Sequence, residues 1–116
     1  FPRESEIARV EYELGKLAVH VRSIENVSGV VVEFDEVIGF RVLDEGDLME
    51  YWPECSTPHG WLFEVTVGGW LSQERSRAGS LIEAMNPEAR EYLVTGEDDC
   101  VSVLCRNEPS VRENAL

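Results

Sequence analysis

Lysine and arginine are scarce in this chain of 116 residues. Ten of them stand against 23 aspartates and glutamates, so the formal net charge is −13. Proteins that bind nucleic acids or anionic membranes do so through clustered Lys and Arg side chains, and the sequence contains no such cluster. No apolar run approaches the roughly 20 residues of a membrane-spanning helix. We therefore expect neither nucleic acid nor a membrane as a partner.

The sequence also lacks the motifs that mark common catalytic centres. It has no Gly-x-Ser-x-Gly nucleophile elbow and no glycine-rich phosphate loop. Neither of its histidines, His20 and His59, stands in a recognisable cysteine-enzyme signature. We predict no catalytic residue and no cofactor, and we expect the protein not to be an enzyme.

Cysteine is rare as well: Cys55, Cys100 and Cys105 form an odd set. An obligate disulfide framework usually has an even number, so reduced thiols in a cytoplasmic protein fit better. Together with His59 they have the chemistry of zinc ligands, but the tight Cys-x-x-Cys spacing is missing. Cys100 and Cys105 are also five residues apart on one predicted strand, so they should face opposite sides. We predict no metal site here.

The chain contains many stretches in which apolar and polar residues alternate, and this pattern predicts β-strands. In the range Gly60 to Gln73, apolar residues alternate up to the Gly68-Gly69 pair, which is typical of a two-residue hairpin turn. The pattern predicts a hairpin at the centre of the core, with Val65 facing Ser72.

Three further hairpins are predicted from the same alternation, around a Gly15-Lys16 turn, a three-residue loop at 35–37 and a four-residue loop at 96–99. A five-residue loop is the alternative for the second of them, because Val37 is a poor residue for the left-handed position of a three-residue loop. The expected cross-strand partners are, in order, Tyr12 with Val19, Glu11 with His20, Val32 with Phe40, Tyr92 with Val103, and Val94 with Val101. Short connections of this kind imply antiparallel pairing.

Two interruptions of the pattern predict short helices. Asp44 can cap a helix that extends to Trp52, and Ser80 with Glu83 forms a capping box for one or two helical segments within 80–90. The expected fold is therefore one mainly β domain spanning 1–116, with residues 1–6 and 109–116 loose. Its strands should form a highly curved antiparallel sheet, a partial barrel or a two-layer sandwich, with one or two short helices.

Acidic residues concentrate in one stretch. The range Glu33 to Glu54 carries eight acidic residues and one basic residue, Arg41. A solvated face that maintains solubility explains such a stretch, and a docking surface for a basic protein partner explains it too. If the protein binds such a partner, we predict the contacts at Asp44, Glu45, Asp47, Glu50, Glu97, Asp98 and Asp99.

The three tryptophans, Trp52, Trp61 and Trp70, offer an alternative. They could line a ligand cleft of a small-molecule-binding domain or enzyme, although packing in the core is the more frequent use of this side chain. A third alternative is a self-associating structural module, because an uncovered sheet edge can pair with a second copy to form a homodimer.

Parts of the sequence resemble small, uncharacterised bacterial cytoplasmic proteins, some of which are found among the immunity proteins of toxin systems. The resemblance spans most of Val30 to Cys105 and rests on three pieces: FRVLDEGDLMEYW (Phe40 to Trp52), GWLFEV with GGWL (Gly60 to Leu71) and EYLVTGEDDCVSVLC (Glu91 to Cys105). It implies a binding role, because an immunity protein occludes a toxin. An acidic surface facing a basic toxin site would suit that role.

Overall fold

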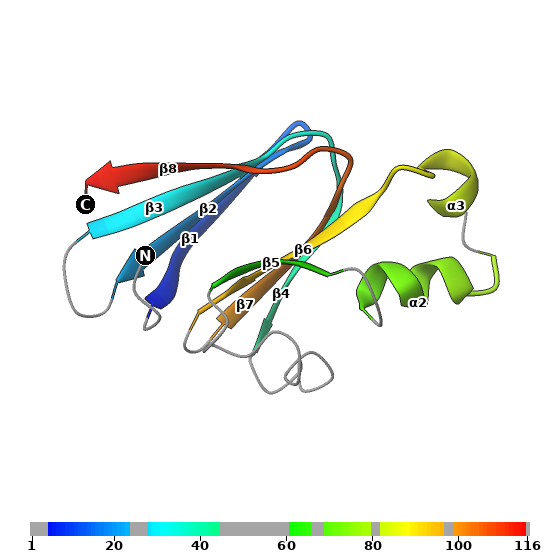
Figure 1. The fold of residues 1–116 in the computed structure, drawn as a ribbon, viewed down its shortest axis with the longest axis horizontal. Coiled ribbons are helices and arrows are strands. Elements are labelled where there is room, and N and C mark those ends of the chain that lie inside the picture. The colour runs from blue at the N-terminus through cyan, green and yellow to red at the C-terminus, as the bar shows by residue number, and fades with distance from the viewer. Residues whose placement is uncertain are drawn as a thin grey trace.

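Two antiparallel four-stranded sheets form the protein (Figure 1). The computed structural model describes residues 5–23, 28–44, 61–65, 69–79, 82–96 and 99–115. The first sheet has the order β1-β2-β3-β8 and contains β1 (Ser5–Glu13), β2 (Lys16–Ser23), β3 (Ser28–Phe34) and β8 (Ser110–Ala115). The second has the order β4-β7-β6-β5 and contains β4 (Val37–Asp44), β5 (Leu62–Val65), β6 (Arg90–Thr95) and β7 (Asp99–Cys105). The predicted mainly β fold class is confirmed.

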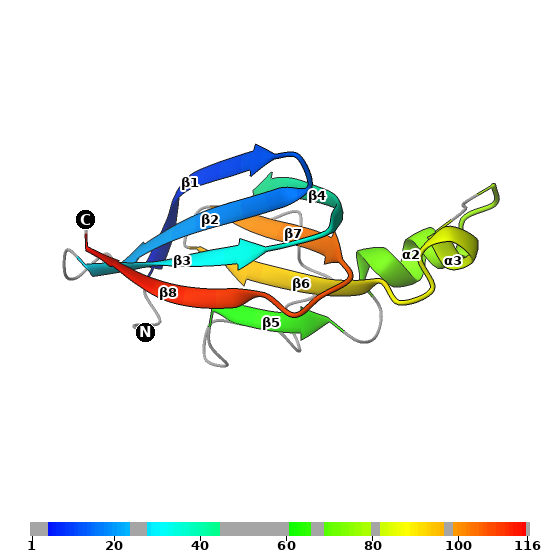
Figure 2. The ribbon, with the colours of Figure 1, turned by 90° about the horizontal axis from the view of Figure 1, so that it is seen from above.

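The sheets lie over one another as two layers that do not close into a barrel (Figure 2). Two short helices, α2 (Trp70–Ser76) and α3 (Ile82–Met85), follow β5 and lie beyond one end of the layers. Neither described helix has the length and apolarity needed to cross a membrane.

The main core fills the space between the sheets, because alternate side chains of each strand point inward. Burying one such valine or leucine contributes roughly 1.5–3 kcal/mol. The fully or almost fully buried residues of this core are Leu17, Val19, Val21, Val30, Val32 and Phe34 from the first sheet and Tyr92, Val94, Val101, Val103 and Cys105 from the second.

The first hairpin forms, but its turn lies one residue earlier than predicted. Leu14 and Gly15 are the turn residues, with φ of 48° and 81°, as a type I′ turn requires. Tyr12 therefore pairs with Leu17 rather than with Val19. Because this moves the register by two residues, the apolar side chains keep the predicted face.

The predicted hairpin around 35–37 is wrong, because the chain crosses here from one sheet to the other. Val32 pairs with Val19 on one side and Val111 on the other, whereas Phe40 pairs with Val103 of the second sheet. The crossover lets β3 and β4 contribute apolar side chains to the same core from different sheets, which a flat hairpin would not allow.

The predicted central hairpin is wrong as well. Val65 pairs with Glu91 of β6 instead of Ser72, and residues 70–76 form helix α2. The neighbouring strand β6 is longer and almost entirely buried, so it is the better partner for β5. Residues 109–116 were expected to be loose, but Ser110–Ala115 form strand β8, which pairs with β3 at the edge of the first sheet.

The remaining predictions have mixed outcomes. The β6–β7 hairpin has the predicted register, with Tyr92 opposite Val103 and Val94 opposite Val101. Helix α3 confirms a helical segment within 80–90. Asp44 is the last residue of β4, and the rest of the helix predicted to follow it lies outside the described residues.

Candidate functional site

Two of the predicted contact residues, Asp44 and Asp99, lie in the described part of the chain, and the structure brings them together. Asp44 ends β4 and Asp99 begins β7, and they are paired across the ladder. Asp99 is exposed, and its carbonyl oxygen accepts a hydrogen bond from the Gly96 N–H at 2.8 Å. We call this pair the acidic corner. The other predicted contacts lie outside the described residues: Glu45, Asp47, Glu50, Glu97 and Asp98.

The tryptophans that the structure describes do not share a cleft. Trp61 packs against the core between the sheets, whereas Trp70 packs on the opposite face of the second sheet, near Leu104. The Trp70 ring lies against Gly39 and beneath the Arg41 guanidinium, whose carbon is 4.6 Å from the ring centroid. Trp52 lies outside the described residues.

The outer face of the first sheet carries charged residues in cross-strand rows, which only the observed register reveals. One row consists of Glu11, Ala18, Glu33 and Ser110, and the next of Arg9, His20, Val31 and Arg112. The glutamates of the first row form ion pairs with the basic residues of the second. Glu11 contacts Arg9 at 3.1 Å and His20 at 2.7 Å, and Glu33 is paired with Arg112.

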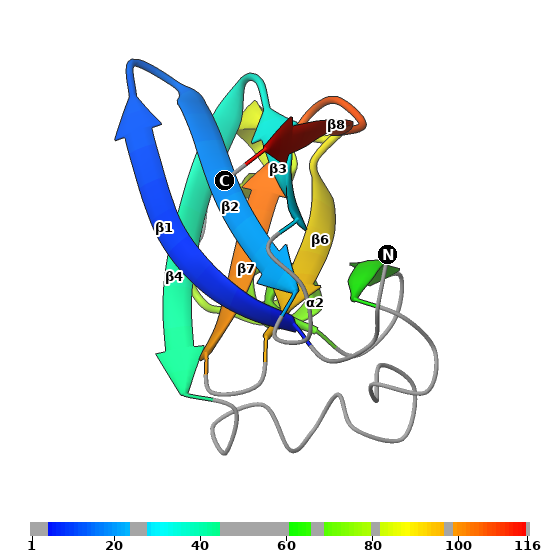
Figure 3. The ribbon, with the colours of Figure 1, turned by 90° about the vertical axis from the view of Figure 1, so that its left-hand side faces the viewer.

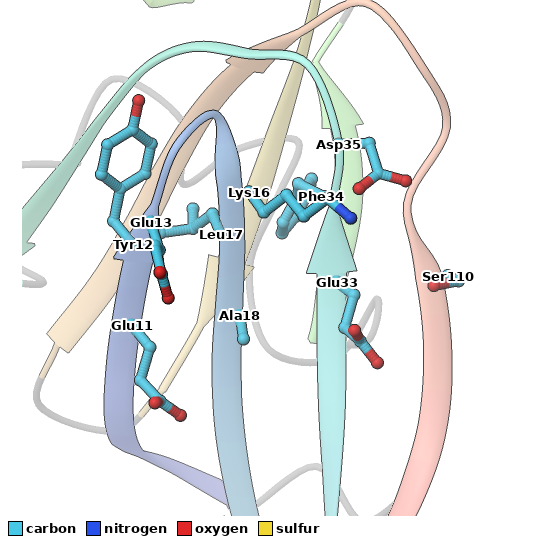
Figure 4. Close-up of a pocket in the computed structure, with 10 residues that line it drawn as sticks. All are labelled: Glu11, Tyr12, Glu13, Lys16, Leu17, Ala18, Glu33, Phe34, Asp35 and Ser110. Atoms are coloured by element: carbon cyan, nitrogen blue, oxygen red, sulfur yellow. The ribbon is translucent and has the colours of Figure 1, made fainter.

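A cavity of about 530 Å³ opens on this face near the first turn (Figure 4). Ala18 lies between the two glutamates of its row, and its small side chain leaves space there. The charged side chains around the cavity are those of Glu11, Glu13, Lys16, Glu33 and Asp35. Glu33 and Asp35 belong to the acidic stretch recognised in the sequence, but no residue of this cavity was predicted as a contact.

A buried carboxylate lies on the other face of the second sheet, and the sequence analysis missed it. Glu91 is only 1% exposed. Its Oε1 accepts the Leu71 N–H at 2.8 Å, and its Oε2 accepts the Ser102 hydroxyl at 3.3 Å. A Cβ added at Gly69 would lie 2.6 Å from Oε1, so glycine is needed before the helix. With both oxygens engaged at the start of α2, Glu91 suits a helix cap better than a general base.

An ion pair with two hydrogen bonds lies at the end of the sheets nearest the helices. Arg90 donates from Nε and Nη2 to the two Glu64 carboxylate oxygens at 3.0 and 2.9 Å. These hydrogen bonds lower the pKa of Glu64, against the opposing effect of partial burial. The Arg90 guanidinium also lies 5.5 Å from the ring centroid of Tyr92, and burial raises the pKa of that phenol to about 12.

The two described cysteines are buried and unsuited to nucleophilic chemistry. Cys105 belongs to the core between the sheets and Cys100 to a cluster on the other face, which confirms that they face opposite sides. Burial raises the pKa of Cys105 to about 11, so its thiol stays protonated at neutral pH. Within the described ranges, no three His, Cys, Asp or Glu side chains gather as a metal would require, and Cys55 and His59 lie outside those ranges.

Comparisons of the chain with protein-family models, with curated proteins and with solved structures found no match.

Proposed function

We propose that this protein is a non-enzymatic acidic domain that binds a basic protein, and that it acts as an immunity protein against a bacterial toxin in the cytoplasm. The observation that carries the proposal is the pairing of Asp44 with Asp99. This pairing places the backbones of two acidic residues that are far apart in the sequence side by side at one corner of the second sheet.

Electrostatics supports this reading. A net charge of −13 attracts a cationic partner over distances of about one Debye length, roughly 8 Å at physiological ionic strength. Clustered carboxylates at the acidic corner would then orient the partner on arrival.

The resemblance to bacterial immunity proteins implies a specific kind of protein binding, in which the bound partner is a toxin. A toxin that cleaves nucleic acid binds phosphates through Lys and Arg side chains. An acidic surface that occupies this site would block the toxin without any chemistry of its own. The same surface would make association fast and dependent on salt.

The test is a pull-down from the native host with the tagged protein at low and high salt, comparing two matched variants. D44N/D99N removes two charges at the acidic corner, and E88Q/E108Q removes two at residues 88 and 108, both of which are exposed. We expect a basic protein to be recovered at low salt by wild type and by E88Q/E108Q, with recovery reduced about tenfold or more for D44N/D99N. Recovery of no partner at either salt, or equal recovery by both variants, would overturn the proposal.

A further inference from the structure

Large apolar side chains are exposed together where β1 and β4 run along the same side of the sandwich. Tyr12 is 51% exposed, Leu14 92% and Val42 50%. Phe40 is partly buried and packs against Tyr12, with the ring centroids 5.2 Å apart. We call the surface formed by these four residues the β1–β4 side.

This side consists of two sheet edges. Among the described strands, β1 pairs only with β2, and β4 pairs only with β7. Figure 3 shows β1 and β4 along the same side of the two layers. The Val37 N–H donates to the Gly15 carbonyl oxygen at 2.9 Å and so ties the start of β4 to the turn after β1. An edge strand offers backbone N–H and C=O groups that an added strand can pair with.

Leu14 has a backbone conformation that lowers the stability of the fold and an exposed side chain that does not offset this cost. Its φ of 48° is a left-handed conformation that costs a leucine free energy, and Asn or Gly would adopt it more easily. Its side chain is 92% exposed, so burial within the chain does not compensate for that cost. Strained residues of this kind are found at binding sites, where a partner supplies the missing contact.

Charge identifies the kind of partner. Glu13 is exposed beside Tyr12, and β4 continues from Val42 to Asp44, so the β1–β4 side is continuous with the acidic corner. A second copy would bring its own net charge of −13, which opposes self-association. A chain with basic side chains would instead meet opposite charge at both ends of the apolar surface.

We propose that the β1–β4 side docks an extended segment of a basic protein, whose apolar side chains cover Leu14, Tyr12 and Val42 and whose Lys or Arg side chains meet Glu13 and the acidic corner. The segment adds as a strand along the edge of β4, which pairs with β7 alone among the described strands. This inference rests on the proposed function, because it names the surface and the form of the partner that the acidic corner attracts.

The test is a titration of the isotope-labelled protein with a blocked eight-residue peptide of alternating Val and Arg, followed by backbone amide chemical shifts. The control peptide has the same composition, with the four Val residues before the four Arg residues. L14N and V42S are the test variants. V111S is the matched control, because Val111 is 47% exposed on β8, at the far edge of the first sheet.

We expect the alternating peptide to shift the amides of Tyr12, Leu14 and Val42, and to bind about fivefold more weakly, or worse, to L14N and V42S than to V111S. L14N should be more stable than wild type, so its weaker binding would not reflect misfolding. Equal binding by all three variants, or equal binding of both peptides, would overturn the inference.

Other outcomes separate this inference from the proposed function. If D44N/D99N weakens peptide binding and L14N and V42S do not, the acidic corner binds the partner and the β1–β4 side does not. If the peptide does not bind while the pull-down still recovers a basic protein, the inference fails and the proposed function stands. Concentration-dependent dimerisation that V42S abolishes would identify the occupant as a second copy and also overturn the inference.

Discussion

Replacing Glu91 by leucine tests whether a buried carboxylate holds helix α2 on the sheet. The side chain is 1% exposed, and its oxygens accept hydrogen bonds from the Leu71 N–H and the Ser102 hydroxyl. Leucine has a similar volume but accepts no hydrogen bond. E91L therefore leaves both donors without their acceptor while the site remains filled.

The expected loss follows from these two donors. A buried donor that loses its acceptor costs about 1–3 kcal/mol, and removing a negative charge that lies beside the N-terminus of a helix costs a further 0.3–1 kcal/mol or so. Relief from burying a charge opposes these losses. We expect E91L to lower the free energy of unfolding by about 2–4 kcal/mol, a large part of the roughly 5–15 kcal/mol that a domain has.

Glutamine separates the hydrogen bonds from the charge. In E91Q the amide oxygen can still accept from Leu71, and the amide N–H can donate to the Ser102 hydroxyl oxygen, because a hydroxyl both donates and accepts. We expect E91Q to lie within about 1 kcal/mol of wild type. The exposed neighbour Glu88 supplies the control, and E88L should change stability little.

The assay is chemical denaturation of all four proteins, with hydrogen exchange of the α2 amides as a local measurement. In E91L the α2 amides should exchange faster relative to those of β7. An E91L protein as stable as wild type, with α2 protected, would refute the argument that this carboxylate caps the helix.

Three further variants test single features of the fold. L14N should raise the free energy of unfolding by about 1 kcal/mol, measured by denaturation, because Leu14 occupies a left-handed conformation with an exposed side chain. Y92F should leave the free energy of unfolding unchanged or raise it by up to about 1 kcal/mol, because no described group hydrogen-bonds the buried Tyr92 hydroxyl. A Y92F protein less stable than wild type by more than about 1 kcal/mol would show that the hydroxyl does have a hydrogen-bond partner. E64Q should cost about 0.5 kcal/mol at pH 7, since Arg90 lowers the pKa of the half-exposed Glu64. That stabilisation is present above the unfolded-state pKa of about 4.3 and is lost as the pH falls through the lower folded pKa, so the difference in stability between E64Q and wild type should shrink steadily as the pH is lowered below about 4.

The sequence pattern predicts a register where both strands and their turn are close together in the chain. The β6–β7 hairpin was predicted correctly because the polar residues 96–99 mark the loop between two apolar runs and so fix Val94 against Val101 and Tyr92 against Val103. At the first turn, two alignments bury the same face, because they differ by two residues. The alternation of apolar and polar residues therefore does not choose between the two alignments of β1 and β2. The observed one requires a positive φ at Leu14, which is unusual for leucine.

Features that depend on distant residues could not be predicted in this way. Alternation shows which side chains of β3 and β4 point inward, but not that the two strands belong to different sheets. Helix α2 begins where a strand was predicted, because its first turn is capped by Glu91, twenty residues further along the chain. In the sequence, Glu91 is one more glutamate in an acidic protein.

The acidic residues differ in what they can offer a partner, and the difference depends on the fold rather than on composition. Glu11 and Glu33 already contact Arg9, His20 and Arg112, so a basic partner would have to compete with these pairs. No ion pair of the described residues involves Glu13 or Asp99, so a cation that approaches either side chain has no existing ion pair to displace, although Lys16 lies opposite Glu13 on β2. Electrostatic recognition should therefore concentrate at the acidic corner and beside the first turn rather than at the glutamates that are already paired.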